Sequence, residues 1–295
     1  MPLGKAVIYP TCRRGYRLFL GVLTTLILSG GPTMAVDEVQ VIYEINTVLM
    51  ETTFRIEGNG STGTAFILAK TEDIDPTKGP YVLVTAAHVL EEMKGDVAIL
   101  HLRKPSEDKG WNRVLFPINI RKGETILWTK HPDADIAAMY LGLPAGTLSR
   151  QLGTPLLADD EMLQRFEIHP GDNLNCLGFP IGLESGEEGF PMLRSGRIAS
   201  YPLWPTKERK TFLFDFEVFR GNSGGPVYFV DSNRFYKGGT KLGEKIQFLV
   251  GLVSEEVMLK EEIKEFYGKR EQHYPLKLAR VVHASLINET IALLP

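Results

Sequence analysis

Short runs of β-branched and aromatic residues recur along most of the chain, and they constrain its fold more than any other feature. Clusters of Gly, Pro, Asp and Asn separate the runs, in a chain of 295 residues that holds 29 Gly and 18 Pro. Such runs between turn-forming clusters are typical of short antiparallel strands. We predict strands at Gly63–Ala69, Tyr81–Thr85, Val97–Leu102, Ile136–Leu141, Leu174–Leu177, Thr211–Val218, Pro226–Val230 and Gln247–Ser254. The pattern as a whole predicts an all-β fold.

Three segments have helical spacing instead. The segment His88–Met93 predicts one short helix, and Val257–Phe266 carries alternating charges with apolar residues on one side. From Leu276 to Leu294 the apolar residues recur at three- and four-residue intervals. This last pattern predicts a terminal amphipathic helix that docks on a barrel.

The stretch Gly142–Asp160 is the best candidate for a connector between two halves of the chain, because it contains several Gly and Pro residues and few long apolar runs. It separates an N-terminal half, residues 36–150, from a C-terminal half, residues 151–295. We predict that each half forms an antiparallel six-stranded β-barrel, and that the second barrel ends in the terminal helix.

The N-terminal 35 residues differ in kind from the rest. Four basic residues between Lys5 and Arg17 precede the short apolar run Leu18–Leu28, and small residues lead up to Ala35. This arrangement is typical of a secretory signal peptide with cleavage after Ala35, so that the mature chain begins at Val36. A buried N-terminal helix and a retained membrane anchor are the alternatives. We expect an exported protein, periplasmic or secreted by a bacterium, that meets a membrane only if this segment is kept as an anchor.

Charge and cysteine content indicate which partners and which cellular compartment suit this chain. The 33 basic and 36 acidic residues give a formal charge of −3 and form no long blocks, so a nucleic-acid partner is not expected. Cys12 would leave with the signal peptide, and Cys176 would remain as one thiol without an intrachain partner. An exported chain without disulfides suits a bacterial envelope. Cys176 lies in an apolar, strand-like setting, which predicts a buried core thiol rather than a nucleophile.

A hydroxyl stands inside a glycine-rich turn at Gly221-Asn222-Ser223-Gly224-Gly225. Glycines let a substrate carbonyl approach the backbone and let neighbouring N–H groups point together. We expect Ser223 to be a nucleophile, and the amides of Gly221 and Ser223 to form an oxyanion hole. Two further segments supply a base and a carboxylate, since Thr85-Ala86-Ala87-His88 ends a buried strand and Asp133-Ala134-Asp135 precedes another.

These three segments, Thr-Ala-Ala-His, Asp-Ile-Ala and Gly-Asn-Ser-Gly-Gly-Pro, occur in an order that resembles the trypsin-like (chymotrypsin-fold) serine peptidases, especially their bacterial members. The resemblance extends from about residue 60 to the end. It implies that Ser223 is the nucleophile, His88 the general base and Asp135 the carboxylate that orients the imidazole. Asp133 is the rival of Asp135, which we prefer because Ile136 and Ala137 follow it as in the family motif.

The resemblance also implies substrate contacts. The strand that ends at Ser254 would form one wall of the primary specificity pocket and pair with the substrate backbone. Glu255 and Glu256 follow it, where the family commonly has small or aromatic residues, so they would disfavour acidic substrates or attract basic ones. Glu217 stands where the family places the floor of the pocket. The equal alternative is that Glu217 simply points outward along its strand.

The sequence therefore predicts a serine endopeptidase that hydrolyses peptide bonds of a protein or peptide substrate through an acyl-enzyme, without a cofactor or a metal. A catalytically latent binding protein with the same fold is one alternative. A serine esterase is the other, although Pro226 would interrupt the helix that follows an esterase nucleophile. The remaining histidines have no comparable setting and are expected at the surface: His101, His131, His169, His273 and His283.

Overall fold

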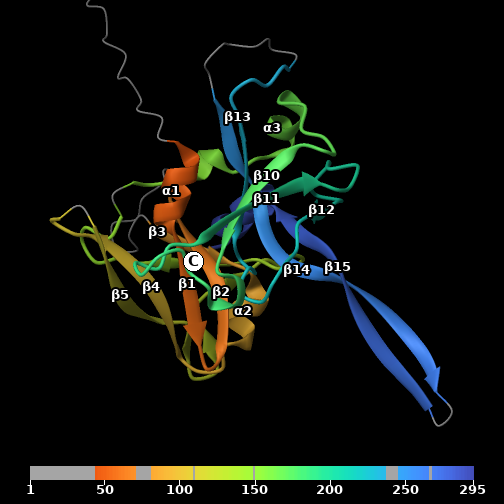
Figure 1. Cartoon of the computed structure of the whole chain (residues 1–295). Helices are drawn as coiled ribbons and strands as arrows, with labels where there is room; N and C mark the ends of the chain where they lie inside the picture. The colour runs from red at the N-terminus through yellow and green to blue at the C-terminus, as the bar shows by residue number, and fades with distance from the viewer. Residues whose placement is uncertain (1–43, 71–80, 109, 149, 237–244, 266–267) are drawn as a thin grey trace, which may run out of the picture. The chain divides into compact units, whose positions relative to one another are not determined.

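The computed structural model describes residues 44–70, 81–108, 110–148, 150–236, 245–265 and 268–295. This part of the chain is mostly β and contains two large strand assemblies (Figure 1). The proposed signal peptide, residues 1–35, lies outside the described residues. No helix within the described ranges is both long enough and apolar enough to cross a membrane.

The N-terminal assembly is an antiparallel sheet of seven strands in the order β5-β4-β1-β2-β3-β9-β8. Between β5 and β8 along the chain, β6 (Arg121–Lys122) and β7 (Thr125–Ile126) form a separate two-stranded antiparallel ribbon. The helices of this half are α1 (Ile45–Thr52) and α2 (Ala87–Glu92). The sheet strands are β1 (Thr53–Gly58), β2 (Ser61–Ala69), β3 (Tyr81–Thr85), β4 (Val97–Pro105), β5 (Trp111–Asn119), β8 (Thr129–Lys130) and β9 (Ala137–Leu141).

The C-terminal assembly is a closed six-stranded barrel in the order β10-β11-β12-β15-β14-β13. Short helical turns η1 (Thr154–Leu156), α3 (Asp160–Arg165) and η2 (Pro180–Gly182) precede or interrupt it, and α4 (Ala284–Ala292) follows it. The barrel strands are β10 (Asn173–Gly178), β11 (Met192–Ile198), β12 (Thr211–Asp215), β13 (Pro226–Asp231), β14 (Ile246–Glu265) and β15 (Gly268–His283).

Each of the eight predicted strands is present, and the all-β class, the six-stranded C-terminal barrel and the C-terminal helix are confirmed. The N-terminal half differs in detail from the six-stranded barrel that we expected for residues 36–150. It is a seven-stranded sheet whose end strands, β5 and β8, are not paired with each other. The strand β8 has two residues, which is too short for the ladder that would close the sheet.

One helix prediction is wrong, and the start of the terminal helix is misplaced, both at the hairpin of β14 and β15. The segment Val257–Phe266, predicted to be helical, forms the outer part of β14 up to Glu265. The predicted terminal helix begins at Ala284 rather than Leu276, because residues 276–283 belong to β15. These strands pair with each other, for example Leu259 with Tyr274, and that long-range ladder overrides the local helical spacing.

The helix α4 packs against both β9 of the sheet and β14 of the barrel, and it buries Leu286, Ile287 and Ile291. The predicted connector also touches both assemblies, because Ala69 N–H donates to the Leu152 carbonyl and Ala158 N–H donates to the Leu249 carbonyl, each at 2.8 Å. One continuous group of buried apolar side chains therefore runs through both halves. Each fully buried large apolar side chain in it contributes roughly 1.5–3 kcal/mol to stability.

Candidate active site

Two neighbouring strands bring a histidine and a carboxylate to the same end of the N-terminal sheet. The strand β3 pairs with β9 so that Thr85 lies opposite Ala137. Immediately beyond β3 the chain turns into α2, which carries His88, and immediately before β9 lies Asp135. Ala86 and Ala87 are fully buried, so only small side chains fit at this turn.

Asp135 holds His88 through two hydrogen bonds. The Nδ1 atom of His88 lies 2.7 Å from Oδ2 of Asp135, and the His88 backbone N–H donates to Oδ1 at 3.0 Å. Asp135 also accepts a hydrogen bond from the Ser254 hydroxyl at 2.6 Å. A carboxylate at Nδ1 leaves Nε2 of the neutral imidazole free to accept a proton.

The site shifts the pKa of both groups. Burial alone would raise the pKa of Asp135, but the hydrogen bond and charge of His88, with the Ser254 hydroxyl, outweigh it and lower that pKa to about 2. Burial alone would lower the pKa of His88, but the hydrogen bond and charge of Asp135 raise it above its ordinary value, with smaller contributions from Glu92 and Glu255. Asp135 is therefore an anion throughout the physiological range.

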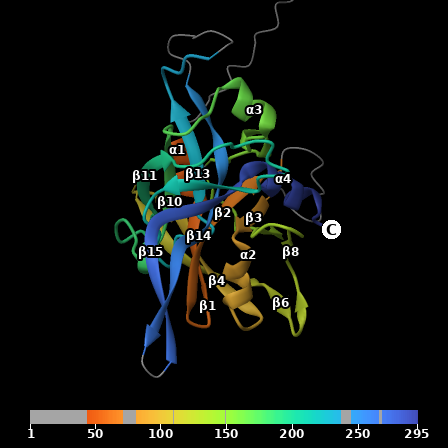
Figure 2. The same cartoon turned by 90° about the vertical axis from the view of Figure 1, so that its right-hand side faces the viewer.

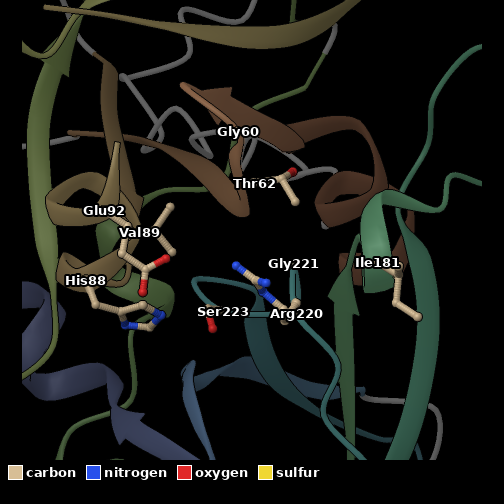
Figure 3. A pocket seen from close by; sticks show the side chains of 9 residues that line it. All are labelled: Gly60, Thr62, His88, Val89, Glu92, Ile181, Arg220, Gly221 and Ser223. Atoms are coloured by element: carbon tan, nitrogen blue, oxygen red, sulfur yellow. The ribbon is translucent and has the colours of Figure 1, made fainter. Parts of the chain in front are cut away.

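Ser223 lies in the loop between β12 and β13, on the wall of the same cavity as His88 (Figure 3). Its hydroxyl donates a hydrogen bond to the main-chain carbonyl of Ser254, 2.9 Å away. Among the described residues no hydrogen bond joins Ser223 to His88. The residue Ser254 thus contacts Ser223 through its carbonyl and Asp135 through its side chain.

The glycines of the serine turn are required by their surroundings. Gly221 has φ +94°, and a Cβ there would lie 2.2 Å from the Phe179 carbonyl oxygen. Gly224 has φ +84°, and a Cβ there would lie 2.1 Å from the Thr64 carbonyl oxygen. Any side chain at either position would therefore displace the loop.

Thr64, on β2, anchors this loop to the N-terminal sheet. Its hydroxyl donates to the Gly221 carbonyl at 2.6 Å and accepts from the Phe179 N–H at 3.2 Å. Its own N–H donates to the Ser223 carbonyl at 2.9 Å. Within the described residues, the amides of Gly221 and Ser223 donate to no backbone carbonyl, so both donors remain available beside the hydroxyl.

Two cavities flank His88. One, of about 340 Å³, is lined by Thr62, Glu92, Ile181 and Arg220 beside the serine turn (Figure 3). The other, of about 570 Å³, is lined by Asp135, Ser254, Glu255, Lys210 and Arg280, among others. A chain that passes His88 and Ser223 would therefore meet charged side chains on both sides.

The predicted substrate residues occupy different places. Ser254 and Glu255 line the larger cavity, and the Glu255 carboxylate accepts from Nε of Arg280 at 2.8 Å. Glu217 lines neither of these two cavities, and its carboxylate lies 3.4 Å from Nζ of Lys277. The rival carboxylate Asp133 pairs with Lys210 at 2.9 Å rather than with His88.

Sequence reasoning missed several residues of the site, and it misplaced three histidines. No local pattern singles out Thr64, Lys210 or Arg280, because they reach the site through tertiary contacts. Glu92, one turn after His88 on α2, and Arg220, directly before Gly221, could have been found from their proximity to the predicted residues. His101, His131 and His283 are buried, contrary to the surface position that we expected, whereas His169 and His273 are exposed. Cys176 is a buried core thiol as predicted, and burial raises its pKa to about 12.

The sequence matches the family model described as trypsin-like peptidase domain over residues 63–235. No functionally curated protein matches it significantly. Similar solved structures include an inactive form of Rv3671c from M. tuberculosis H37Rv, with 16% identity, a TM-score of 0.44, and coverage of 88% of this chain and 95% of that one. The protease Anisep from Arthrobacter nicotinovorans has 13% identity, a TM-score of 0.42, and coverage of 81% and 93%.

A thermostable serine protease, AL20, from an extremophilic microorganism has 13% identity and a TM-score of 0.42, with 82% of this chain and 95% of that chain covered. The region matched by the family model contains all three segments that carry His88, Asp135 and Ser223.

Proposed function

This chain belongs to the trypsin-like peptidase family, and we propose that it is a serine endopeptidase with Ser223, His88 and Asp135 as its catalytic residues. The observation that carries the proposal is the His88–Asp135 pair, joined at 2.7 Å, on the wall of the cavity that also holds Ser223. An ionised carboxylate that fixes the imidazole tautomer beside a hydroxyl is the arrangement that activates a serine for acyl transfer.

In the proposed reaction His88 removes the Ser223 proton as the hydroxyl attacks the substrate carbonyl. The hydroxyl must first turn away from the Ser254 carbonyl, a rotation about one side-chain torsion between staggered positions. His88 then donates the proton to the leaving amine, and water, activated by the same imidazole, releases the acyl group from Ser223.

The amides of Gly221 and Ser223 are the proposed oxyanion hole. Each such donor typically supplies about 3 kcal/mol of transition-state stabilisation. The hydrogen bond from Thr64 to the Gly221 carbonyl orients the peptide plane between Gly221 and Asn222, and so positions the loop that presents these amides. Thr64 is a positioning residue in this scheme, because it acts through the loop.

The substrate is a protein or peptide chain, which suits the family and the open cavities on both sides of His88. Ser254 and Glu255 would contact the substrate from the wall of the larger cavity. Glu217, paired with Lys277 outside both cavities, is a weaker candidate for recognition. We further propose export from a bacterial cell after removal of residues 1–35, with residues 36–150 and 151–295 as the two halves of the mature enzyme.

One observation favours a second candidate, a latent protein with the same fold. The Ser223 hydroxyl is bonded to Ser254 rather than to His88. A protein that kept this hydrogen bond would bind polypeptides in the same cleft without cleaving them.

The test is hydrolysis of an unfolded protein, with every new amino and carboxyl terminus identified by mass spectrometry. We expect cleavage at internal peptide bonds, and a loss on the order of a millionfold in turnover for Ser223→Ala. Hydrolysis of small esters but of no peptide bond would identify an esterase. Tight binding of the unfolded protein without any hydrolysis would identify the latent protein.

A further inference from the structure

Asp135 lies just outside the strand that follows it. The pairing of β3 with β9 ends where Thr85 lies opposite Ala137, so the ladder does not include Asp135 itself. The strand that precedes it, β8, has only two residues. The position of the Asp135 carboxylate therefore depends on the turn of residues 131–136, which connects β8 to β9.

Little packing holds this turn in place. Residues 132–133 are exposed, and residues 134–135 are half-buried. The buried side chains of the turn are those of Ile136, at its end, and His131, at its start, which is 3% exposed. A buried imidazole needs hydrogen-bond partners for its ring nitrogens, so His131 is the residue that can hold the turn through directed bonds.

Both ring nitrogens of His131 have partners. Nδ1 accepts a hydrogen bond from the Asp133 main-chain N–H at 3.1 Å, and Nε2 lies 3.3 Å from Oε2 of Glu289. Because Nδ1 is an acceptor, the neutral ring carries its proton on Nε2 and donates it to the carboxylate. The main-chain N–H of His131 also donates to the Ile136 carbonyl at 3.0 Å. His131 thus bonds to the turn on both sides of Asp135.

The helix α4 anchors this arrangement from the C-terminal end of the chain. It packs on β9, and Figure 2 shows it on the same side of the molecule as β8. Leu286 and Ile287 of α4 are buried, so the helix is a fixed support. Glu289, which is itself exposed, reaches the His131 ring from this support. One histidine therefore links the turn to the terminal helix.

We propose that His131 is a positioning residue for the active site, which fixes the turn that presents Asp135 to His88, and that Glu289 fixes the His131 ring. The inference rests on the proposed function, since it takes Asp135 as the carboxylate that orients the imidazole. The contact between His88 Nδ1 and Asp135 is 2.7 Å, so a shift of about 1 Å in the turn would take it out of hydrogen-bond range. A misplacement of this size can lower the rate by about 100-fold.

The first measurement is the titration of the His88 ring by NMR in Ser223→Ala protein, so that it does not depend on catalysis. The His88 signal is identified by its absence after His88→Ala. Burial opposes it, but the hydrogen bond and charge of Asp135 raise the pKa of His88, so a displaced carboxylate should lower the midpoint. We expect His131→Leu to lower the His88 midpoint by about 0.5–1 pH unit.

Three variants separate positioning from stability. His131→Asn keeps an acceptor for the N–H two residues further on, as in an Asx-turn, and should restore most of the midpoint. Glu289→Ala removes the anchor of the ring but favours the helix, so it should lower the midpoint without destabilising α4. His101→Leu is the control and should leave the midpoint unchanged, because His101 is similarly buried on β4, which β1 and β2 separate from β3.

The second measurement is steady-state hydrolysis of a peptide by the same variants with Ser223 intact. In His131→Leu, kcat should fall roughly 10- to 100-fold with little change in KM, because the turn positions a catalytic group rather than the substrate. Most of the lost kcat should return in His131→Asn. Circular dichroism establishes that each variant folds, and if His131→Leu does not fold, Glu289→Ala decides the outcome.

An unchanged His88 midpoint in Glu289→Ala and in folded His131→Leu would overturn the inference. An equal shift in His101→Leu would overturn it too, because the loss of any buried histidine would then have the same effect. Absence of hydrolysis by the parent protein would contradict the proposed function instead, and it would leave the NMR result unchanged.

Discussion

The Ser223 hydroxyl donates a hydrogen bond to the Ser254 carbonyl, 2.9 Å away, while the Ser254 hydroxyl donates to Asp135 at 2.6 Å. One residue of β14 thus contacts both the proposed nucleophile and the proposed orienting carboxylate. Because Asp135 also holds His88, the three proposed catalytic groups are connected through Ser254 even while Ser223 and His88 are not bonded to each other. In the proposed reaction Ser223 exchanges the Ser254 carbonyl for His88 as the acceptor of its hydroxyl proton.

Substitution of Asp135 and of Asp133 should have different effects on kcat. We expect Asp135→Asn to lower kcat by roughly 10⁴-fold, the loss described for a serine peptidase in which the equivalent amide favours the wrong imidazole tautomer. Asp133→Asn should leave kcat nearly unchanged, because this carboxylate pairs with Lys210. Steady-state kinetics on a peptide substrate measures both. A larger loss for Asp133→Asn would reassign the orienting role.

The pH dependence of kcat/KM should follow the protonation of the His88 imidazole. Protonated His88 cannot accept the Ser223 proton, so kcat/KM should rise with pH through a midpoint above the ordinary histidine value of about 6.5. Removing a nearby negative charge destabilises the imidazolium, so Glu92→Gln should shift the midpoint to lower pH. Its neighbour Glu91 pairs with Lys130 at 2.6 Å, and Glu91→Gln serves as the control. Identical midpoints in the two variants would contradict this electrostatic account.

His283 should make the fold less stable in mild acid. Burial lowers its pKa to about 4, with the charge of Asp160 opposing, and neither ring nitrogen has a hydrogen-bond partner among the described residues. As the pH falls from about 6.5 to 4, His283 takes up a proton in the unfolded chain but stays neutral in the folded chain. This difference lowers the free energy of unfolding by about 3 kcal/mol. His283→Leu should remove this contribution.

The measurement for His283 is urea unfolding at several pH values, with the difference between the parent and His283→Leu taken at each pH. The exposed His169 provides the control substitution, His169→Leu. His88 titrates in both members of each pair, so its opposite contribution cancels. A difference that did not change between pH 7 and pH 4.5 would show that His283 is not a buried neutral imidazole.

Arg103 is a buried cation that ties the two halves together. It is 1% exposed, donates to the carbonyls of Gly189 at 2.7 Å, Met50 at 2.9 Å and Thr53 at 2.5 Å, and stacks on Phe190. Lysine cannot reproduce this planar set of donors, so Arg103→Lys should lower the free energy of unfolding by about 3 kcal/mol. The exposed neighbour Lys104 gives the control Lys104→Arg, and chemical denaturation measures both. A change below about 1 kcal/mol would contradict the structural role.

The sequence predicted the parts of the molecule that short segments determine. The strand Tyr81–Thr85 has the predicted limits, because its apolar run is bounded by a turn and by small residues before His88. The motif around Ser223 likewise needs its glycines for local steric reasons. Local information failed where pairing decides the structure. The residues around Leu259 have charge spacing that suits a helix, yet they form a strand because Tyr274 and its neighbours pair with them.

The same distinction applies to the site. Thr64 is 157 residues from Gly221, and the hydrogen bond between them follows from the way in which the sheet and the barrel pack. Nothing near Thr64 in the sequence indicates that contact. His283 is the last residue of β15, in a stretch whose sequence suggests a helix, and it is buried where it packs on Phe212 with ring centroids 4.9 Å apart. Long-range packing of this kind is not encoded in any short window.

The most direct test of the proposed catalytic site is covalent labelling of residues 36–295 by a fluorophosphonate, with the modified residue identified by mass spectrometry. Such reagents require an activated serine, so we expect labelling of Ser223 that is lost in Ser223→Ala and in His88→Ala. Circular dichroism of both variants would establish that they fold. Labelling of Ser223 that persists without His88, or no labelling of well-folded parent protein, would contradict the proposed site.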